Sequence, residues 1–164
     1  MKRAGHECMW SCEIEKYRRA VYRFHWGRVD AGDVRNVDAS EIPDFDVLCA
    51  GFPCQSFSTL GKRLGFDDPR GRLFFEIVRI AKVKKPPLLF LENVKGLLHN
   101  RGGRTFAVIL RELGDLGYRT EWQVLDSADF GLPQRRERVF IIGRLGEKGG
   151  KEIFPLPKES VEKK

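Results

Sequence analysis

The sequence predicts an α/β fold, a doubly wound parallel sheet in which strands alternate with helices. Short apolar runs typical of buried strands alternate with longer segments whose apolar residues recur at helical spacing. In such sheets, ligands bind at the carboxyl ends of the strands. Polar side chains stand at or just past four of the expected strand ends, and these are the first candidates for a site: Glu13, Asp33, Cys54 and Glu92.

The expected elements follow in chain order. Tyr17, Ala20, Val21 and Phe24 stand at i, i+3, i+4 and i+7, which indicates a helix with one buried face. Further helices are expected over 73–81, stopped by a Pro-Pro pair, and over 106–116, ended by a glycine. Strands are expected over 6–13, 29–34, 46–51, 88–91, 122–125 and 139–143. The charged, proline-containing segment 146–164 is expected to be a linker or frayed tail, which leaves 1–145 as one partial domain.

Composition favours a polyanionic partner. The 164 residues carry 30 Lys and Arg against 23 Asp and Glu, a net charge of +7. The sequence has neither an apolar run long enough to span a membrane nor a secretory leader, so we expect a cytoplasmic protein without a membrane partner. Its four cysteines form no Cys-x-x-Cys pair and have no histidine at zinc-finger spacing, so we expect no metal site.

Three motifs carry reactive groups. A thiol stands in Gly51-Phe52-Pro53-Cys54, directly after a strand-like run, and small polar residues follow it. A carboxyl group, Glu92, ends the apolar run 88–91 and is followed by Asn93 and Val94. Guanidinium groups cluster in Gln134-Arg135-Arg136-Glu137-Arg138. In their order and spacing, these motifs resemble those of the DNA cytosine-5-methyltransferase family.

The resemblance implies a covalent mechanism for methyl transfer to C5 of cytosine. Cys54 would attack C6 of the base, which makes C5 nucleophilic. Glu92 would act at N3, and Arg136 would lie near O2 and the thiol to stabilise the developing charge. Arg138 would brace Glu92 or the loop, and Asn93 would hold the loop rather than react.

The same resemblance implies S-adenosyl-L-methionine as the cofactor. Glu13 would take the ribose hydroxyls and Ile14 would contact the adenine. Asp33 would bind the adenine amine while Val34 packs on the ring. Leu73 would also line the adenine pocket, and Pro53 would contribute from the segment that carries the thiol.

The implied substrate is double-stranded DNA with the target cytosine flipped out, because C5 and C6 are out of reach inside the stacked duplex. The segment 58–70 resembles a mobile loop that closes over DNA, and its basic side chains would hold phosphates. The implied DNA-binding residues are Gln55, Ser58, Lys62, Arg63 and Arg70.

The resemblance covers residues 5–143 and departs from the family in two ways. The family's first, central strand, which ends in a glycine-rich Phe-x-Gly-x-Gly turn around the cofactor, is not found, and neither is the target recognition domain. We therefore expect a Rossmann-like methyltransferase sheet lacking its first central strand, hence a fragment or one piece of a split enzyme with a complementing polypeptide. Such a chain should have poor stability alone, because unpaired strand edges would face a gap in the sheet.

Three other interpretations stay open. A non-catalytic remnant would bind nucleic acid or a partner without transferring methyl, and the missing cofactor turn favours it. A tRNA cytosine-5-methyltransferase would use the same chemistry on another substrate. A cysteine hydrolase would need a histidine partner, and His6, His25 and His99 stand in no motif.

Overall fold

The computed structural model describes residues 5–53, 73–146 and 153–156. The chain divides into two compact units, Met1–Phe45 and Asp46–Lys164, and each is described by itself. Among the described residues, no helix is long and apolar enough to cross a membrane.

The first unit is built around helix α1, Lys16–Trp26. The Glu15 carboxylate accepts a hydrogen bond from the Arg18 backbone N–H and caps the helix start, and Gly27, with φ of 99°, ends the helix. The expectation of a buried helix face is wrong here, since no residue of α1 is buried and Phe24 is 85% exposed. Periodicity makes an apolar stripe, but burial also requires a facing surface.

The strands expected over 6–13 and 29–34 are wrong in extent. The two segments meet only in a parallel bridge between Cys12 and Ala31, and the chain then enters two short 3-10 helices, Val34–Asn36 and Ala39–Glu41. The side chains of Asp33 and Asp38 accept hydrogen bonds from backbone N–H groups two residues on. These local bonds favour turns over strand extension.

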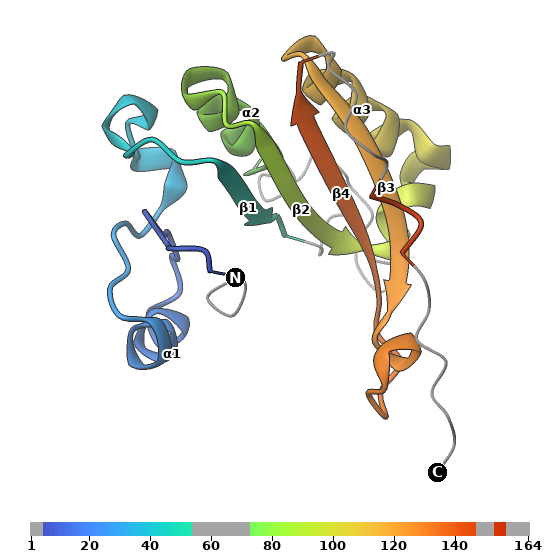
Figure 1. The fold of residues 1–164 in the computed structure, drawn as a ribbon, viewed down its shortest axis with the longest axis horizontal. Helices are drawn as coiled ribbons and strands as arrows, with labels where there is room; N and C mark the ends of the chain where they lie inside the picture. The colour runs from blue at the N-terminus through green and yellow to red at the C-terminus, as the bar shows by residue number, and fades with distance from the viewer. Residues whose placement is uncertain (1–4, 54–72, 147–152, 157–164) are drawn as a thin grey trace. The chain divides into compact units, whose positions relative to one another are not determined.

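The second unit contains a four-stranded sheet with helices α2 (Leu73–Lys84) and α3 (Arg104–Asp115) packed against it (Figure 1). The strands lie in the order β1-β2-β4-β3, with β1 at one edge. Their bounds are Val47–Gly51 for β1, Leu88–Val94 for β2, Tyr118–Asp126 for β3 and Glu137–Leu145 for β4.

The sheet is mixed rather than fully parallel. β1 and β2 run parallel, whereas β4 is antiparallel to both of its neighbours. A parallel connection needs a crossover of a dozen or more residues, usually a helix. Only a short 3-10 helix, Ser127–Phe130, and a turn join β3 to β4, so β4 returns in the opposite direction.

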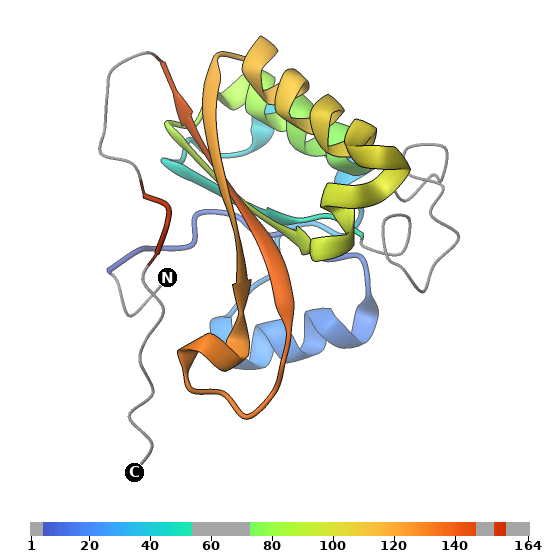
Figure 2. The same ribbon diagram turned by 90° about the vertical axis from the view of Figure 1, so that its right-hand side faces the viewer.

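The core lies between the sheet and its two helices, which both lie on the same side of it (Figure 2). Alternate residues of β2, Leu89 and Leu91, are fully buried, as are Ile109 and Leu113 of α3. On the opposite face of the sheet, the rings of Phe90 and Phe140 stack with centroids 5.7 Å apart.

Residues 153–156 lie along β3, within the segment that the sequence marks as linker or tail. Backbone N–H groups of Ile153 and Phe154 donate to Oε2 of Glu121 at 2.8 and 3.2 Å, and that of Leu156 donates to the Gln123 side chain. Burial would raise the pKa of Glu121, but these donors and the Arg144 charge outweigh it and lower the pKa.

Candidate active site

The sheet has one end at which β1, β2 and β3 finish and β4 begins. The register places Gly51 opposite Glu92, Val94 opposite Arg138, and Asp126 opposite Glu137. This topology gathers the carboxyl and guanidinium motifs at the end of β1, just before the thiol motif.

Asn93 ties the carboxyl motif to the start of the thiol motif. Its side chain is 1% exposed, and its Nδ2 donates to the Phe52 carbonyl at 3.1 Å. Its Oδ1 accepts from the Val94 backbone N–H at 2.8 Å. A buried amide whose nitrogen and oxygen are both hydrogen-bonded fixes the position of the backbone segments that it bonds. Asn93, which is expected to hold the loop, therefore contacts Phe52, two residues before Cys54 in the chain.

Glu92 and Arg138 form an ion pair across β2 and β4. Nε of Arg138 lies 2.8 Å from Oε1 of Glu92, and the side chains are 21% and 36% exposed. Gly51 lies beside Glu92 in the register, and a methyl group at Gly51 would be 3.4 Å from Glu92 Oε2, which is an ordinary van der Waals contact. Arg138 is therefore in contact with Glu92, and the bracing role that the resemblance implies for it stays a prediction.

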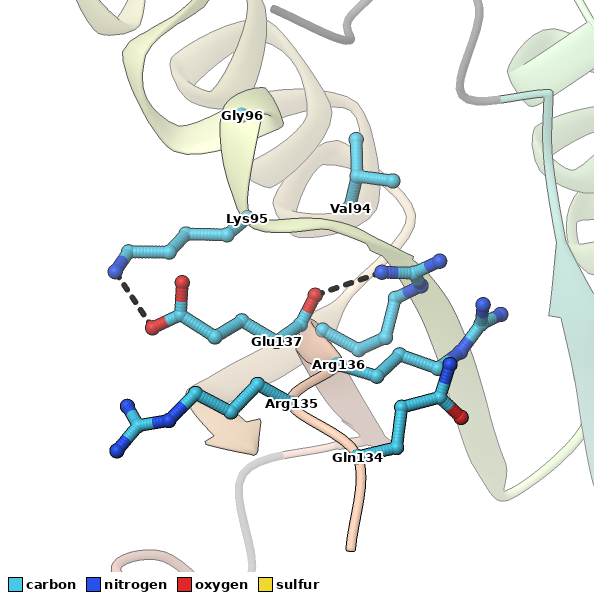
Figure 3. A pocket seen from close by; sticks show the side chains of 8 residues that line it. Val94, Lys95, Gly96, Gln134, Arg135, Arg136 and Glu137 are labelled. Carbon is cyan, nitrogen blue, oxygen red and sulfur yellow. Dashed lines mark hydrogen bonds and ion pairs between the residues drawn. The ribbon is translucent and has the colours of Figure 1, made fainter. Parts of the chain in front are cut away.

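A hollow of about 370 Å³ opens beside this pair. Arg135 and Arg136 extend in opposite directions at this hollow (Figure 3). Nζ of Lys95 lies 2.7 Å from Oε1 of Glu137 across the strands. Four cations and one carboxylate leave the hollow with a positive charge suited to an anion or an electron-rich base. Its lining is Val94, Lys95, Gly96, Gln134, Arg135, Arg136, Glu137 and Arg138.

Sequence reasoning missed three residues at this edge: Lys95, Asp126 and Ser127. Lys95 reaches Glu137 only because of the β2–β4 register, which no local pattern in the sequence reveals. Asp126 and Ser127 hold the loop before β4 through backbone bonds. Their signal is a capping residue, an Asp before a short helical turn, which is common enough in proteins to be passed over.

The first unit places two of the expected cofactor residues together. The Cys12–Ala31 bridge is parallel, so Glu13 and Asp33 follow its two sides at the same end. Burial raises the pKa of the Cys12 thiol, and the charges of Asp33 and Glu13 add to the effect. The two carboxylates therefore act on a common neighbour.

Other bonds engage these carboxylates as well. Glu13 Oε1 accepts from the Glu15 backbone N–H at 2.9 Å. Hydrogen bonds from the Arg35 side chain and backbone lower the pKa of Asp33. Ile14 is 61% exposed, and Val34 starts the 3-10 helix that follows Asp33.

The remaining expected residues divide between the described and undescribed parts of the chain. Pro53 and Leu73, at the two borders of the undescribed segment 54–72, are both half-buried. Cys54, Gln55, Ser58, Lys62, Arg63 and Arg70 lie outside the described residues. Within the described ranges, no group of three or more His, Cys, Asp or Glu side chains could hold a metal ion.

Two solved methyltransferase structures have a fold similar to that of this chain. The Entamoeba histolytica methyltransferase EhMeth matches with a TM-score of 0.73 and 19% identity, covering 92% of this chain and 48% of that one. The S. pombe Dnmt2 methyltransferase matches with a TM-score of 0.67 and 21% identity, covering 90% and 44%. At these identities the likeness establishes the fold, which is the α/β methyltransferase fold that the sequence predicts.

Sequence comparison narrows the class. The type II methyltransferase M.NgoBI of Neisseria gonorrhoeae is 51% identical over 135 residues, which are 82% of this chain and 43% of that protein. M.HaeII of Haemophilus aegyptius is 49% identical over 94% of this chain and 47% of its own length. The family model for C-5 cytosine-specific DNA methylase matches residues 1–164. The chain belongs to this family, and it spans less than half the length of these curated relatives.

Proposed function

We propose that this chain carries the catalytic segment of a DNA cytosine-5-methyltransferase. The observation that carries the proposal is the Glu92–Arg138 ion pair of 2.8 Å, set at the strand edge where Asn93 holds the Phe52 carbonyl. Cys54 follows Pro53 directly in the sequence, so the thiol motif starts from this edge. Thiol, carboxyl and guanidinium are the three groups that addition to C6 of cytosine requires.

In the proposed reaction, the Cys54 thiolate forms a bond to C6, and the electrons of the 5,6 double bond move toward C5 and N3. Glu92 in its protonated, neutral form donates a proton to N3 and is left as the carboxylate that pairs with Arg138. The positive charge of Arg136 stabilises the charge that develops at O2. When bound, S-adenosyl-L-methionine supplies a methyl group on positively charged sulfur. Once C5 carries the methyl group, N3 returns its proton to the Glu92 carboxylate and solvent takes the C5 proton. The electrons of the C5–H bond re-form the 5,6 double bond as the C6–S bond breaks and Cys54 leaves as the thiolate.

The first unit has donor chemistry that fits this cofactor. Glu13 and Asp33 present carboxylates at the same end of a parallel bridge, and carboxylates accept hydrogen bonds from ribose hydroxyls and an adenine amine. Ile14, which is 61% exposed, offers an apolar surface for a ring. We therefore propose that Glu13, Ile14, Asp33 and Val34 bind the nucleoside part of the cofactor. Pro53 and Leu73 are proposed as cofactor-binding residues on the resemblance alone.

Double-stranded DNA with a flipped cytosine is the substrate we propose. The net charge of +7 and the cationic hollow suit a polyanion. DNA rather than tRNA is favoured because the matching family model is that of DNA methylases and identities near 50% are with type II methyltransferases. The DNA contacts that we propose are Gln55, Ser58, Lys62, Arg63 and Arg70.

We propose that the protein is part of a restriction-modification system and lies in the cytoplasm of a bacterial or phage-infected cell.

A complementing polypeptide is the second partner we propose. The relatives are more than twice as long as the stretch they share with this chain. In the described part of the second unit, β1 pairs with β2 alone and stands at the edge of the sheet. Edge strands accept further strands through their backbone groups. The chain alone is then a methyltransferase that needs added segments for full activity.

Methyl transfer to DNA tests the proposal. The chain is incubated with DNA and methyl-labelled S-adenosyl-L-methionine, alone and with the parts of M.NgoBI that it does not match supplied in trans. The DNA is then digested and its nucleosides are identified by mass spectrometry. We expect label in 5-methylcytosine that disappears with Cys54→Ser. Label in an exocyclic amine, or no label under either condition, would contradict the proposal.

A further inference from the structure

The loop between β3 and β4 carries Arg136, and two adjacent side chains at its start close it. Oδ1 of Asp126 accepts from the backbone N–H of Arg136 at 2.8 Å and from that of Ala128 at 3.2 Å. The hydroxyl of Ser127 donates to the Gln134 carbonyl, and the Ser127 backbone N–H donates to the Arg136 carbonyl at 3.4 Å. The ten-residue loop is thus tied at both ends to one short stretch.

The Asp126 carboxylate is placed for this role by the sheet. Asp126 is the last residue of β3 and lies opposite Glu137, the first residue of β4. The ladder therefore stops at Glu137, the residue that follows Arg136, and the Asp126 side chain takes over where the strand pairing stops. A charged acceptor makes a stronger bond to a backbone N–H than a neutral one does.

We propose that Asp126 is a positioning residue that fixes the Arg136 backbone so that its guanidinium lies in the cationic hollow. Arg136 is exposed and lies just outside β4. Its side chain is therefore not held by burial, and its backbone is not held by strand pairing. Its neighbour Arg138 has a carboxylate partner in Glu92, at 2.8 Å. Arg136 makes its hydrogen bonds to this loop through its backbone, and the shorter of them, at 2.8 Å, is accepted by Asp126.

This inference rests on the proposed function, because placing Arg136 matters to catalysis only if Arg136 acts on the base. Substrate-positioning errors of about 1 Å can cost on the order of 100-fold in rate. A loop closed by two side chains is a place where such an error can be introduced without touching the substrate.

Two matched variants, Asp126→Asn and Asp115→Ala, separate an effect of Asp126→Ala on Arg136 from general damage to the fold. Asp126→Ala removes both backbone acceptor bonds, whereas Asp126→Asn keeps an oxygen at Oδ1 and the same shape. Asp115→Ala, at the exposed end of α3, loses the same charge without touching the loop. Amide exchange of Leu89, which is fully buried in the core, reports whether the fold itself has loosened.

The first readout is amide hydrogen exchange at Arg136 in the full chain. We expect Asp126→Ala to speed this exchange about tenfold while Leu89 is unchanged, and Asp126→Asn to restore most of the protection. Unchanged exchange at Arg136 in Asp126→Ala would overturn the inference, whatever the chain does to DNA.

The second readout is methyl transfer in the complemented chain, measured as the single-turnover rate and the DNA dissociation constant. We expect Asp126→Ala to lower the rate about tenfold or more with little change in DNA affinity, and Asp126→Asn to recover it. A normal rate despite faster exchange would show that the loop bond does not position Arg136 for the reaction. If the parent chain transfers no methyl group, the proposed function fails, and the exchange data alone decide whether Asp126 fixes Arg136.

Discussion

Nε of Arg138 lies 2.8 Å from Oε1 of Glu92. This ion pair joins the second residue of β4 to the C-terminal part of β2. The pair joins two motifs that are more than forty residues apart in the sequence. Arg138 holds one carboxylate oxygen of Glu92, and the other oxygen lies beside Gly51 in β1. That geometry suits a group that must meet a substrate in a fixed orientation.

Replacing Arg138 should therefore impair the reaction more than the fold. Partly exposed ion pairs contribute at most about 1 kcal/mol to stability, so Arg138→Ala should lower the free energy of unfolding only slightly. Methyl transfer should fall about tenfold or more, because Glu92 loses its orientation. Arg138→Lys keeps the charge without the planar fork and should recover only part of the rate. Equal rates for all three chains would rule out a role for the pair.

Asn93→Ala should destabilise the second unit. The substitution removes the donor to the Phe52 carbonyl and the acceptor of the Val94 N–H from a fully buried site. We expect a loss of about 1–3 kcal/mol in the free energy of unfolding, measured by urea denaturation. Asn36→Ala, at an exposed position in the first unit, is the control and should change stability by less than about 0.5 kcal/mol.

Two glycines should respond to alanine in opposite directions. A methyl group at Gly143 in β4 would lie 3.1 Å from Leu89 Cδ1 and 3.3 Å from Tyr118 Cδ1, both in the packed core. Gly143→Ala should therefore cost about 1–3 kcal/mol. At Gly114 in α3 nothing lies within 4 Å of the added carbon, so Gly114→Ala should stabilise by up to about 1 kcal/mol. Thermal melts of both variants measure the two changes in stability. A Gly143→Ala chain as stable as the parent would contradict the core packing.

Tyr118 should make stability fall at alkaline pH. Burial raises its pKa from the usual 10.0 to about 12, and its hydroxyl donates to the Pro86 carbonyl at 2.8 Å. The raised pKa stabilises the folded state below pH 10, and this contribution is lost as the pH rises from 10 toward 12, because the unfolded tyrosine ionises first. Urea unfolding between pH 8 and 11 should show a decline that Tyr118→Phe lacks. Tyr17→Phe, at a 78% exposed position, should decline as the parent does.

The elements of the second unit followed well from local pattern. Segments 46–51, 73–81, 88–91 and 106–116 all lie within or beside observed elements of the expected type. The observed β3 and β4 each extend beyond the expected runs, because the added residues are mostly polar or charged and lie outside the apolar stretches. The antiparallel return of β4 was missed because a lone 3-10 turn in the connection looks much like the start of a crossover.

The site was predictable where motifs carry the chemistry and unpredictable where register does. Glu92, Arg136 and Arg138 are found at one edge because their motifs end β2 and begin β4. The Lys95–Glu137 pair and the Asp126 bond to Arg136 depend on which residues face each other across strands, and a single sequence does not encode register visibly. In the first unit, the turn-forming aspartates outweighed the weak strand signal around residues 29–34.

Trapping of the covalent intermediate is the most direct test of the central claim that Cys54 attacks C6 of cytosine. The complemented chain is mixed with S-adenosyl-L-methionine and DNA containing 5-fluorocytosine, in which fluorine blocks the final elimination. A denaturation-resistant adduct that peptide mass spectrometry maps to Cys54, and that Cys54→Ser abolishes, is the predicted result. An adduct at another residue, or methylated DNA from Cys54→Ser, would contradict the account.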